Sequence, residues 1–183
     1  MRFPSLLAIV VIAAACSNAD NTPAKAGAPA ASAPVASVVN AKPTKVDFAI
    51  PLTVYKPKDI NFEMYRNRWS LLFYFLPTCG HCQHTYPWIQ KLRTSYEKKG
   101  LAFAAIASGT ATAEDLQMFD TDFKLDMPTF QDGTRKFGEL YGTGSVPLIL
   151  VVKPDGSFQS WVGSDDSTRV AIEAVIKAGL HIK

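Results

Sequence analysis

The sequence is poor in cysteine and in histidine, with three residues of each among its 183. Cys16 closes an apolar segment at the N-terminus, so the rest of the chain holds only Cys79 and Cys82. An exported domain that is held together by disulfides usually carries several cysteines at long separations. So small a number excludes that class of scaffold. It also leaves any zinc site without the second ligand pair that four-coordinate zinc needs.

The chain also lacks a large charge excess and a second long apolar run. Its 19 lysines and arginines nearly balance 16 aspartates and glutamates, and no basic stripe is interleaved with aromatic residues. Nucleic acid is therefore not expected as a partner. Beyond the N-terminus, no apolar run reaches the roughly 20 residues that span a bilayer. Any attachment to a membrane must therefore come from the N-terminal segment.

The N-terminus has the layout of an export signal. Arg2 supplies a positive charge, an apolar run follows, and three alanines precede Cys16. Because the apolar run is too short to span a bilayer, we expect residues 1–15 to be a signal peptide. Small residues that lead directly into a cysteine resemble the lipobox of bacterial lipoproteins, in which that cysteine is acylated. The resemblance implies lipidation of Cys16; the alternative is plain secretion, with Cys16 lost in the cleaved peptide.

A polar stretch follows the signal. Residues 17–44 consist largely of Ala, Pro, Ser, Asn and Thr, and such a segment cannot bury enough apolar surface to offset its ordering entropy. We expect residues 16–44 to be a lipid-anchored, disordered tether and residues 45–183 to form one domain. Ser17 differs from the Asp that retains some lipoproteins at the inner membrane, which favours the outer membrane.

The remaining residues alternate strand and helix signals. The continuous apolar run over 69–76 indicates a strand buried on both faces, and Gly100 marks the end of a helix that begins at Gly80. In chain order, the patterns predict strands over 69–76, 101–107, 127–130, 146–152 and 157–162, and helices over 80–99, 112–123, 135–141 and 168–178. This order predicts an α/β sandwich with helices on both faces of a mixed central sheet.

The two cysteines of the C-G-H-C stretch are compatible with four chemistries. Covalent haem needs a histidine directly after the second cysteine, but Gln83 stands there. Cys79, Cys82 and His84 make three candidate ligands, so copper or zinc binding stays open. A structural disulfide across so short a loop would restrain the unfolded chain very little. The fourth chemistry, a reversible dithiol, is favoured.

A cysteine between a buried strand and a helix is well suited to thiol exchange. The unpaired N–H groups of the first helical turn and the positive end of the helix favour the thiolate of Cys79. Cys82 is expected to lie one turn further along and to be less exposed. This asymmetry fits attack by Cys79 and resolution of the mixed disulfide by Cys82. A protonated His81 would stabilise the thiolate further.

The region around the dithiol resembles the active-site segment of the thioredoxin superfamily. The C-G-H-C pair is followed in the helix by Pro87, and residues 144–147 (Gly-Ser-Val-Pro) match the loop whose cis-proline faces the dithiol. The turn at 153–156 (Lys-Pro-Asp-Gly) matches the hairpin turn that follows that loop. Together with the signal and the tether, the domain from about Phe48 is similar to the TlpA-like periplasmic thiol-disulfide oxidoreductases.

This resemblance implies a thioredoxin-like three-layer sandwich, a cis bond before Pro147, and substrate docking at Val146 and Pro147. Two features depart from related proteins. The strand before the dithiol lacks the buried acid of thioredoxin, and Thr85 stands where some TlpA-like proteins of cytochrome c maturation carry Glu.

These observations predict an enzyme that is lipid-anchored on the periplasmic side of a bacterial cell envelope and exchanges electrons with cysteine-containing envelope proteins. A TlpA-like reductase is the leading hypothesis. The resemblance implies a monomer without metal or cofactor that receives its electrons from a membrane donor. Because C-G-H-C also resembles the motif of protein disulfide isomerase, a DsbA-like oxidant or an isomerase stays open. From another class, the alternative is a metallochaperone that holds copper or zinc on Cys79, Cys82 and His84.

Overall fold

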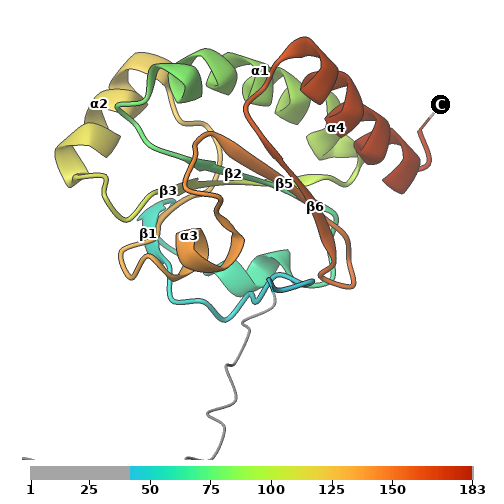
Figure 1. Ribbon diagram of the computed structural model, residues 1–183, viewed down its shortest axis with the longest axis horizontal. Helices are drawn as coiled ribbons and strands as arrows, with labels where there is room; N and C mark the ends of the chain where they lie inside the picture. Colours follow the sequence, from blue (N-terminus) through green and yellow to red (C-terminus); the bar gives the residue numbers. More distant parts are fainter. Residues whose placement is uncertain (1–41, 183) are drawn as a thin grey trace, which may run out of the picture. The chain divides into compact units, whose positions relative to one another are not determined.

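The computed structural model describes residues 42–182, which form a six-stranded mixed sheet with helices on both faces (Figure 1). The strands are β1 (Thr53–Lys56), β2 (Ser70–Phe75), β3 (Ala102–Ala107), β4 (Thr129–Gln131), β5 (Leu148–Val152) and β6 (Phe158–Val162). The helices are α1 (Gly80–Tyr96), α2 (Ala113–Phe123), α3 (Lys136–Tyr141) and α4 (Asp166–Gly179), with 3-10 turns η1 (Phe62–Tyr65) and η2 (Glu97–Lys99). The predicted fold class is confirmed. The predicted signal peptide over 1–15, Cys16, and the tether as far as residue 41 lie outside the described residues.

The sheet has the strand order β1-β4-β3-β2-β5-β6. Strands β2, β3 and β4 are parallel neighbours, whereas β1, β5 and β6 each run antiparallel to the strand that they join. In the central pair, Tyr74 of β2 lies opposite Leu148 of β5. The end of β2 therefore lies beside the start of β5, which brings the segments after Phe75 and before Leu148 together.

Two hydrophobic cores lie on the two faces of this sheet. All six residues of β2 are buried, and their side chains alternate between the faces. Leu71, Phe73 and Phe75 pack with α1, α2 and α4, while Leu72 and Tyr74 pack with η1, α3 and the segment before β1. Figure 1 shows these two layers above and below the sheet. Burial of each large apolar side chain stabilises the fold by about 1.5–3 kcal/mol, which explains why an unbroken apolar run forms the central strand.

Helix α1 carries one apolar face, and the first cysteine of the dithiol lies just before that face begins. Its buried residues recur at helical spacing: Cys82, Thr85, Tyr86, Ile89, Leu92 and Tyr96. Pro87 lies inside the helix on its exposed side. The predicted helix over 80–99 corresponds to α1 and η2 together, and Gly100 ends them in the left-handed conformation, with φ of 103°. The same periodicity that builds the core therefore places Cys82 inside it.

Two elements near the start of the domain were missed, and one helix starts earlier than predicted. β1 contains only four residues and pairs at the edge of the sheet with β4, and η1 is a single 3-10 turn. Neither is long enough to show a hydrophobic period. Helix α4 begins before the predicted position 168, because the Asp165 side chain accepts a hydrogen bond from the Thr168 N–H and caps the helix.

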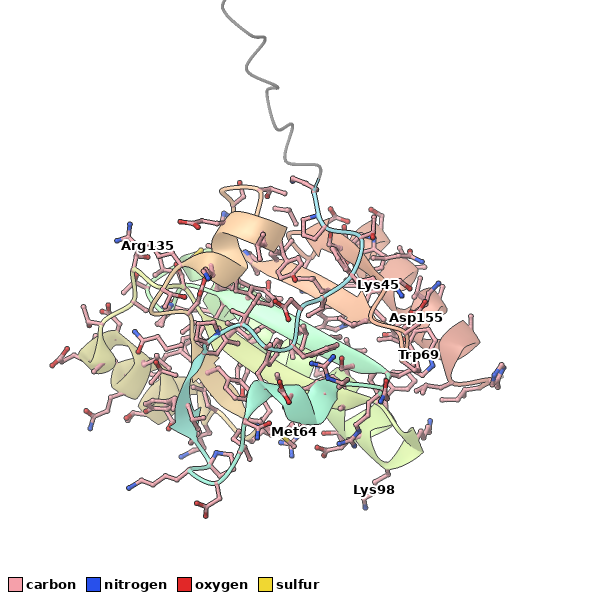
Figure 2. The ribbon with its side chains drawn as sticks, turned by 90° about the horizontal axis from the view of Figure 1, so that it is seen from below. Lys45, Met64, Trp69, Lys98, Arg135 and Asp155 are labelled. Atoms are coloured by element: carbon pink, nitrogen blue, oxygen red, sulfur yellow. The ribbon has the colours of Figure 1, made fainter. Side chains whose placement is uncertain are left out.

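The segment before β1 is joined to the far end of the β5–β6 hairpin. Lys45 and Ser157 form an antiparallel bridge, and the Val46 N–H donates to the Gly156 carbonyl oxygen over 2.9 Å. Figure 2 shows this face of the molecule, with Lys45 near Asp155 of the hairpin turn. Within residues 42–182, no helix has the length and apolar character needed to cross a membrane.

Candidate active site

The dithiol begins where β2 ends. A turn after Phe75 is closed by a 3.0 Å hydrogen bond from the Cys79 N–H to the Leu76 carbonyl oxygen. Cys79 is then the N-cap of α1, and its carbonyl oxygen accepts the first helical bond, from the Gln83 N–H over 3.0 Å. The N–H groups of the first turn lack partners within the helix, and the positive end of the helix lies at this point. The Cys79 sulfur is thus placed where a negative charge is favoured.

The second cysteine is in a different environment. Cys82 is fully buried, at 0% exposure, whereas the Cys79 side chain is partly exposed. The pKa of the Cys82 thiol is raised to about 12, chiefly by burial; a hydrogen bond with the Leu76 backbone lowers it, and the neighbouring Cys79 raises it. At neutral pH, Cys82 is a protonated thiol on the inner side of the pair.

A proline loop faces the dithiol. The Val146–Pro147 peptide bond is cis, the isomer that the resemblance implies, and Pro147 is buried directly before β5. The Cys79 Sγ atom lies 4.0 Å from the Val146 carbonyl oxygen. This proximity follows from the β2–β5 register, since Leu148 lies opposite Tyr74.

The two histidines near the pair are both exposed. His81 lies in the first turn of α1, between the cysteines. His84 lies on the next turn, and its Nδ1 is 2.6 Å from the Gly80 carbonyl oxygen, so that Nδ1 is the donor and carries the hydrogen. In the described part of the chain, no three side chains among His, Cys, Asp and Glu are grouped closely enough to hold a metal ion. Cys79, Cys82 and His84 are therefore not assembled as a three-ligand set.

Val146, whose carbonyl oxygen lies 4.0 Å from the Cys79 Sγ atom, lines two cavities. We call the first the α3-side cavity; it encloses about 370 Å³ and is lined by Tyr74, Leu76, Ser108, Arg135, Gly138 and Val146, among others. The second, the α4-side cavity, encloses about 490 Å³, with His81, Thr85, Val146, Pro147, Ser164 and Arg169 in its wall. Both cavities therefore lie close to the point at which a substrate cysteine would approach Cys79.

Thr85 has a structural role that the sequence did not reveal. Its side chain is 1% exposed, and Oγ1 donates to the His81 carbonyl oxygen over 2.8 Å. The same oxygen lies 2.6 Å from the Ser164 hydroxyl oxygen. Ser164 precedes α4 and is remote from Thr85 in the sequence, so no local pattern predicts the pair. The bond joins the first turns of α1 to the loop that leads into α4.

A buried carboxylate on the α3 side was also missed. Asp132 is 0% exposed and accepts hydrogen bonds from the backbone N–H groups of Phe137 and Gly138, over 3.1 and 2.8 Å. Burial raises the pKa of Asp132, and these two hydrogen bonds oppose the rise. In the sequence, Asp132 precedes a glycine and looks like an ordinary turn residue; only the fold shows that it caps the start of α3.

A buried strand that leads into a dithiol at a helix N-terminus, with a cis-proline loop beside it, defines a protein of the thioredoxin-like class, and the solved structures that it resembles have this fold. The sequence model of the AhpC/TSA family matches residues 44–160, and the chain belongs to that family.

Among known proteins, the thiol-disulfide oxidoreductase ResA of Oceanobacillus iheyensis is 27% identical over 93 residues. That alignment covers 50% of this chain and 47% of the relative, so the match spans about half of each protein. A thiol-disulfide isomerase from Corynebacterium glutamicum has a similar structure, with a TM-score of 0.63, 17% identity, and coverage of 78% of this chain and 98% of its own. A secreted disulfide oxidoreductase of Mycobacterium tuberculosis has a TM-score of 0.58 and 16% identity, with coverage of 69% and 93%. The two structural likenesses concern the fold.

Proposed function

We propose that this protein is a thiol-disulfide oxidoreductase that exchanges electrons with protein cysteines in the cell envelope through Cys79 and Cys82, acting as a TlpA-like reductase. One observation carries the proposal. Cys79 is accessible at a helix N-terminus beside the cis-proline loop, while Cys82, one turn along the same helix, is fully buried. The names of the relatives support the same activity.

The chemistry consists of two exchanges. The Cys79 thiolate attacks one sulfur of a substrate disulfide, a bond forms between Cys79 and that sulfur, and the other substrate sulfur leaves as a thiolate. Cys82 then loses its proton and attacks the Cys79 sulfur, which releases the second substrate thiol. Two electrons have passed to the substrate, and the protein holds a disulfide between Cys79 and Cys82. An upstream membrane dithiol, as the electron donor, restores the reduced pair.

Insulin reduction tests this activity against the metallochaperone alternative. The protein is first treated exhaustively with a chelator, and the precipitation of reduced insulin chains is followed in the presence of dithiothreitol. We expect catalysis to survive chelation and to disappear in Cys79→Ser. A chelated protein that binds copper stoichiometrically but leaves insulin reduction at the uncatalysed rate would favour the metallochaperone.

The direction of electron flow is tested in cells. Acid quenching followed by alkylation of free thiols reports the redox state of the pair. A reductase is expected to be mainly reduced, because the upstream donor keeps it so. A mainly oxidised pair would instead support the DsbA-like oxidant.

The proposed location depends on Cys16. We infer that Cys16 carries lipid and holds the protein on the periplasmic side of a membrane, with the outer membrane favoured by Ser17. In cell fractionation, Cys16→Ser should release a soluble protein or leave an unprocessed precursor, while the dithiol stays active. A correctly processed Cys16→Ser protein that remained in the membrane would contradict lipidation.

A further inference from the structure

The α4-side cavity contains an arginine that the proposed chemistry does not use. Arg169 lies in the first turns of α4 and lines this cavity together with His81 and Val146. Its guanidinium lies over the Trp88 ring of α1, with Cζ 5.3 Å from the ring centroid. Trp88 thereby holds the guanidinium between α1 and α4, where Arg169 and Trp88 also line a neighbouring hollow with Asp166 and Glu173.

One N–H group of the Arg169 guanidinium has no hydrogen-bond acceptor within the described fold. Its Nε atom is buried and has no hydrogen-bond partner, and within residues 42–182 the guanidinium forms no ion pair within 4.0 Å. Asp165, the acidic residue in the same wall, is already engaged. Its Oδ1 accepts hydrogen bonds from the Ser167 hydroxyl and the Thr168 N–H, over 2.6 and 2.8 Å. A guanidinium without an ion-pair partner is a strong binding group for an anion that enters the hollow.

The geometry of a guanidinium selects the ligand. Its planar fork of N–H groups matches the two oxygens of a carboxylate, and a charge-assisted pair of this kind is about twice as strong as a neutral hydrogen bond. The imidazoles of His81 and His84 also lie in this wall. Asp165 keeps its negative charge, but it is the one carboxylate of this wall, whereas Arg169 and the two imidazoles offer several N–H donors to an anion.

The position of the cavity identifies the source of that anion. Val146 lines the cavity, and its carbonyl oxygen lies 4.0 Å from the Cys79 Sγ atom. A polypeptide whose cysteine reacts with Cys79 therefore has neighbouring residues at the mouth of this hollow. Val162, which is 44% exposed, adds an apolar part to the wall that can contact the stem of a longer side chain.

We propose that the α4-side cavity is a substrate subsite that binds an acidic side chain close to the reacting cysteine, with Arg169 as the residue that determines this preference. The inference rests on the proposed function and narrows its substrates to proteins with Asp or Glu near the cysteine.

Peptide disulfides test the subsite in the single exchange step. Three short peptides carry one cysteine flanked by Glu, Gln or Lys, and each is joined through its cysteine to 2-nitro-5-thiobenzoate. In a Cys82→Ala background, Cys79 attacks the peptide sulfur, the peptide–Cys79 disulfide forms, and the coloured thiolate is released and counted. The rates are divided by those of each peptide with dithiothreitol, which removes differences in intrinsic reactivity.

We expect the Glu peptide to react about five- to tenfold faster than the Gln peptide, as one charge-assisted hydrogen bond allows, and the Lys peptide to be the slowest. Arg169→Gln should bring the Glu-to-Gln ratio close to one while the Gln rate stays within about twofold. Arg169→Lys, which keeps the charge without the fork, should retain part of the preference. Arg68→Gln is the matched control, because Arg68 is an exposed arginine outside both cavities; it should keep the full ratio.

The possible outcomes separate the subsite from the activity. If the parent shows no preference for the Glu peptide, or if Arg169→Gln keeps that preference, the proposed subsite is contradicted, while the proposed oxidoreductase activity is not. If no peptide reacts faster than with a Cys79→Ser protein, the proposed function fails and the subsite with it. If circular dichroism shows that Arg169→Gln is misfolded, the salt dependence of the parent protein tests the subsite instead. Its preference must shrink between about 0.01 M and about 1 M salt, as the screening length falls from about 30 Å to about 3 Å, and an unchanged ratio overturns the proposal.

Discussion

Cys82 is fully buried while Cys79, one turn before it on the same helix, is partly exposed. The pair therefore has an outer and an inner sulfur. A substrate sulfur can reach only the outer one, and the inner one can reach only Cys79. This division determines which cysteine should form covalent intermediates with substrates.

The first prediction concerns those intermediates. Cys82→Ala removes the thiol that resolves the mixed disulfide, so adducts between Cys79 and envelope proteins should accumulate. Cys79→Ala leaves only a buried thiol and should give almost none. Non-reducing electrophoresis of acid-quenched cells, with a reduced sample as control, measures both. Equal amounts of adduct in the two variants would overturn the assigned roles.

The second prediction uses the burial of Cys82. Its pKa is raised from 9.0 to about 12 in the folded state. Because the folded value lies above the unfolded one, the stability contributed by the protonated thiol is fully present below pH 9 and is lost as the pH rises towards 12. The slope between these values is about 1.4 kcal/mol per pH unit.

Cys82→Ala lacks this dependence and serves as the reference. Urea unfolding of the reduced proteins at pH about 8 and about 10 should show that the stability of the parent relative to the variant falls by about 1.4 kcal/mol. The tyrosines titrate in both proteins and cancel in the difference. A difference that stays constant over this range would show that Cys82 is not a buried thiol.

The third prediction concerns His81. A positive charge on His81, in the first turn of α1, would stabilise a thiolate at Cys79 and hence the reduced form of the pair. His81→Pro should therefore lower the reduction potential, by about 30 mV for about 1.4 kcal/mol of lost stabilisation. Proline is tolerated there, since the N–H groups of a first turn have no helical partner.

A glutathione titration measures the effect, and two further variants separate charge from backbone. His81→Gln removes the imidazole without introducing the proline ring of His81→Pro, and it should shift the reduction potential in the same direction. His84→Gln, on the exposed next turn, should leave it nearly unchanged. If the reduction potential is unchanged in both His81 variants, His81 does not stabilise the Cys79 thiolate.

The fourth prediction tests the packing behind the α3-side cavity. A methyl group on Gly138 would overlap the Tyr74 hydroxyl oxygen, and Tyr74 cannot move far because it belongs to the central strand β2. Gly138→Ala should therefore lower the free energy of unfolding by about 1–3 kcal/mol. Gly80→Ala is the control, because nothing lies within 4 Å of the added carbon; it should change stability by less than about 1 kcal/mol. Equal urea midpoints for the two variants would contradict the described contact.

The sequence predicted those parts of the fold that follow from local chemistry. The apolar run over 69–76 predicted β2, because apolar side chains on both faces of a strand require burial on both faces. The spacing of Cys79 and Cys82 predicted one outer and one inner cysteine, because the two lie one turn apart at the start of α1. β1 was missed because a four-residue strand at a sheet edge owes its place to pairing with β4 rather than to its own residues. The bond between Thr85 and Ser164 and the stacking of Arg169 on Trp88 join residues that are remote in the chain. Such pairs exist only after the sheet has brought α1 and α4 together.

The bridge between Lys45 and Ser157 determines at which end of the sheet the chain enters the domain. Ser157 follows the turn after Val152, and Val152 lies opposite Ser70, the first residue of β2, whereas Cys79 follows the last. The two sites are therefore separated by the length of β2, about 20 Å at roughly 3.3 Å per residue. The chain therefore enters the domain at the end of the sheet that is remote from the dithiol, and the reactive sulfur lies at the opposite end.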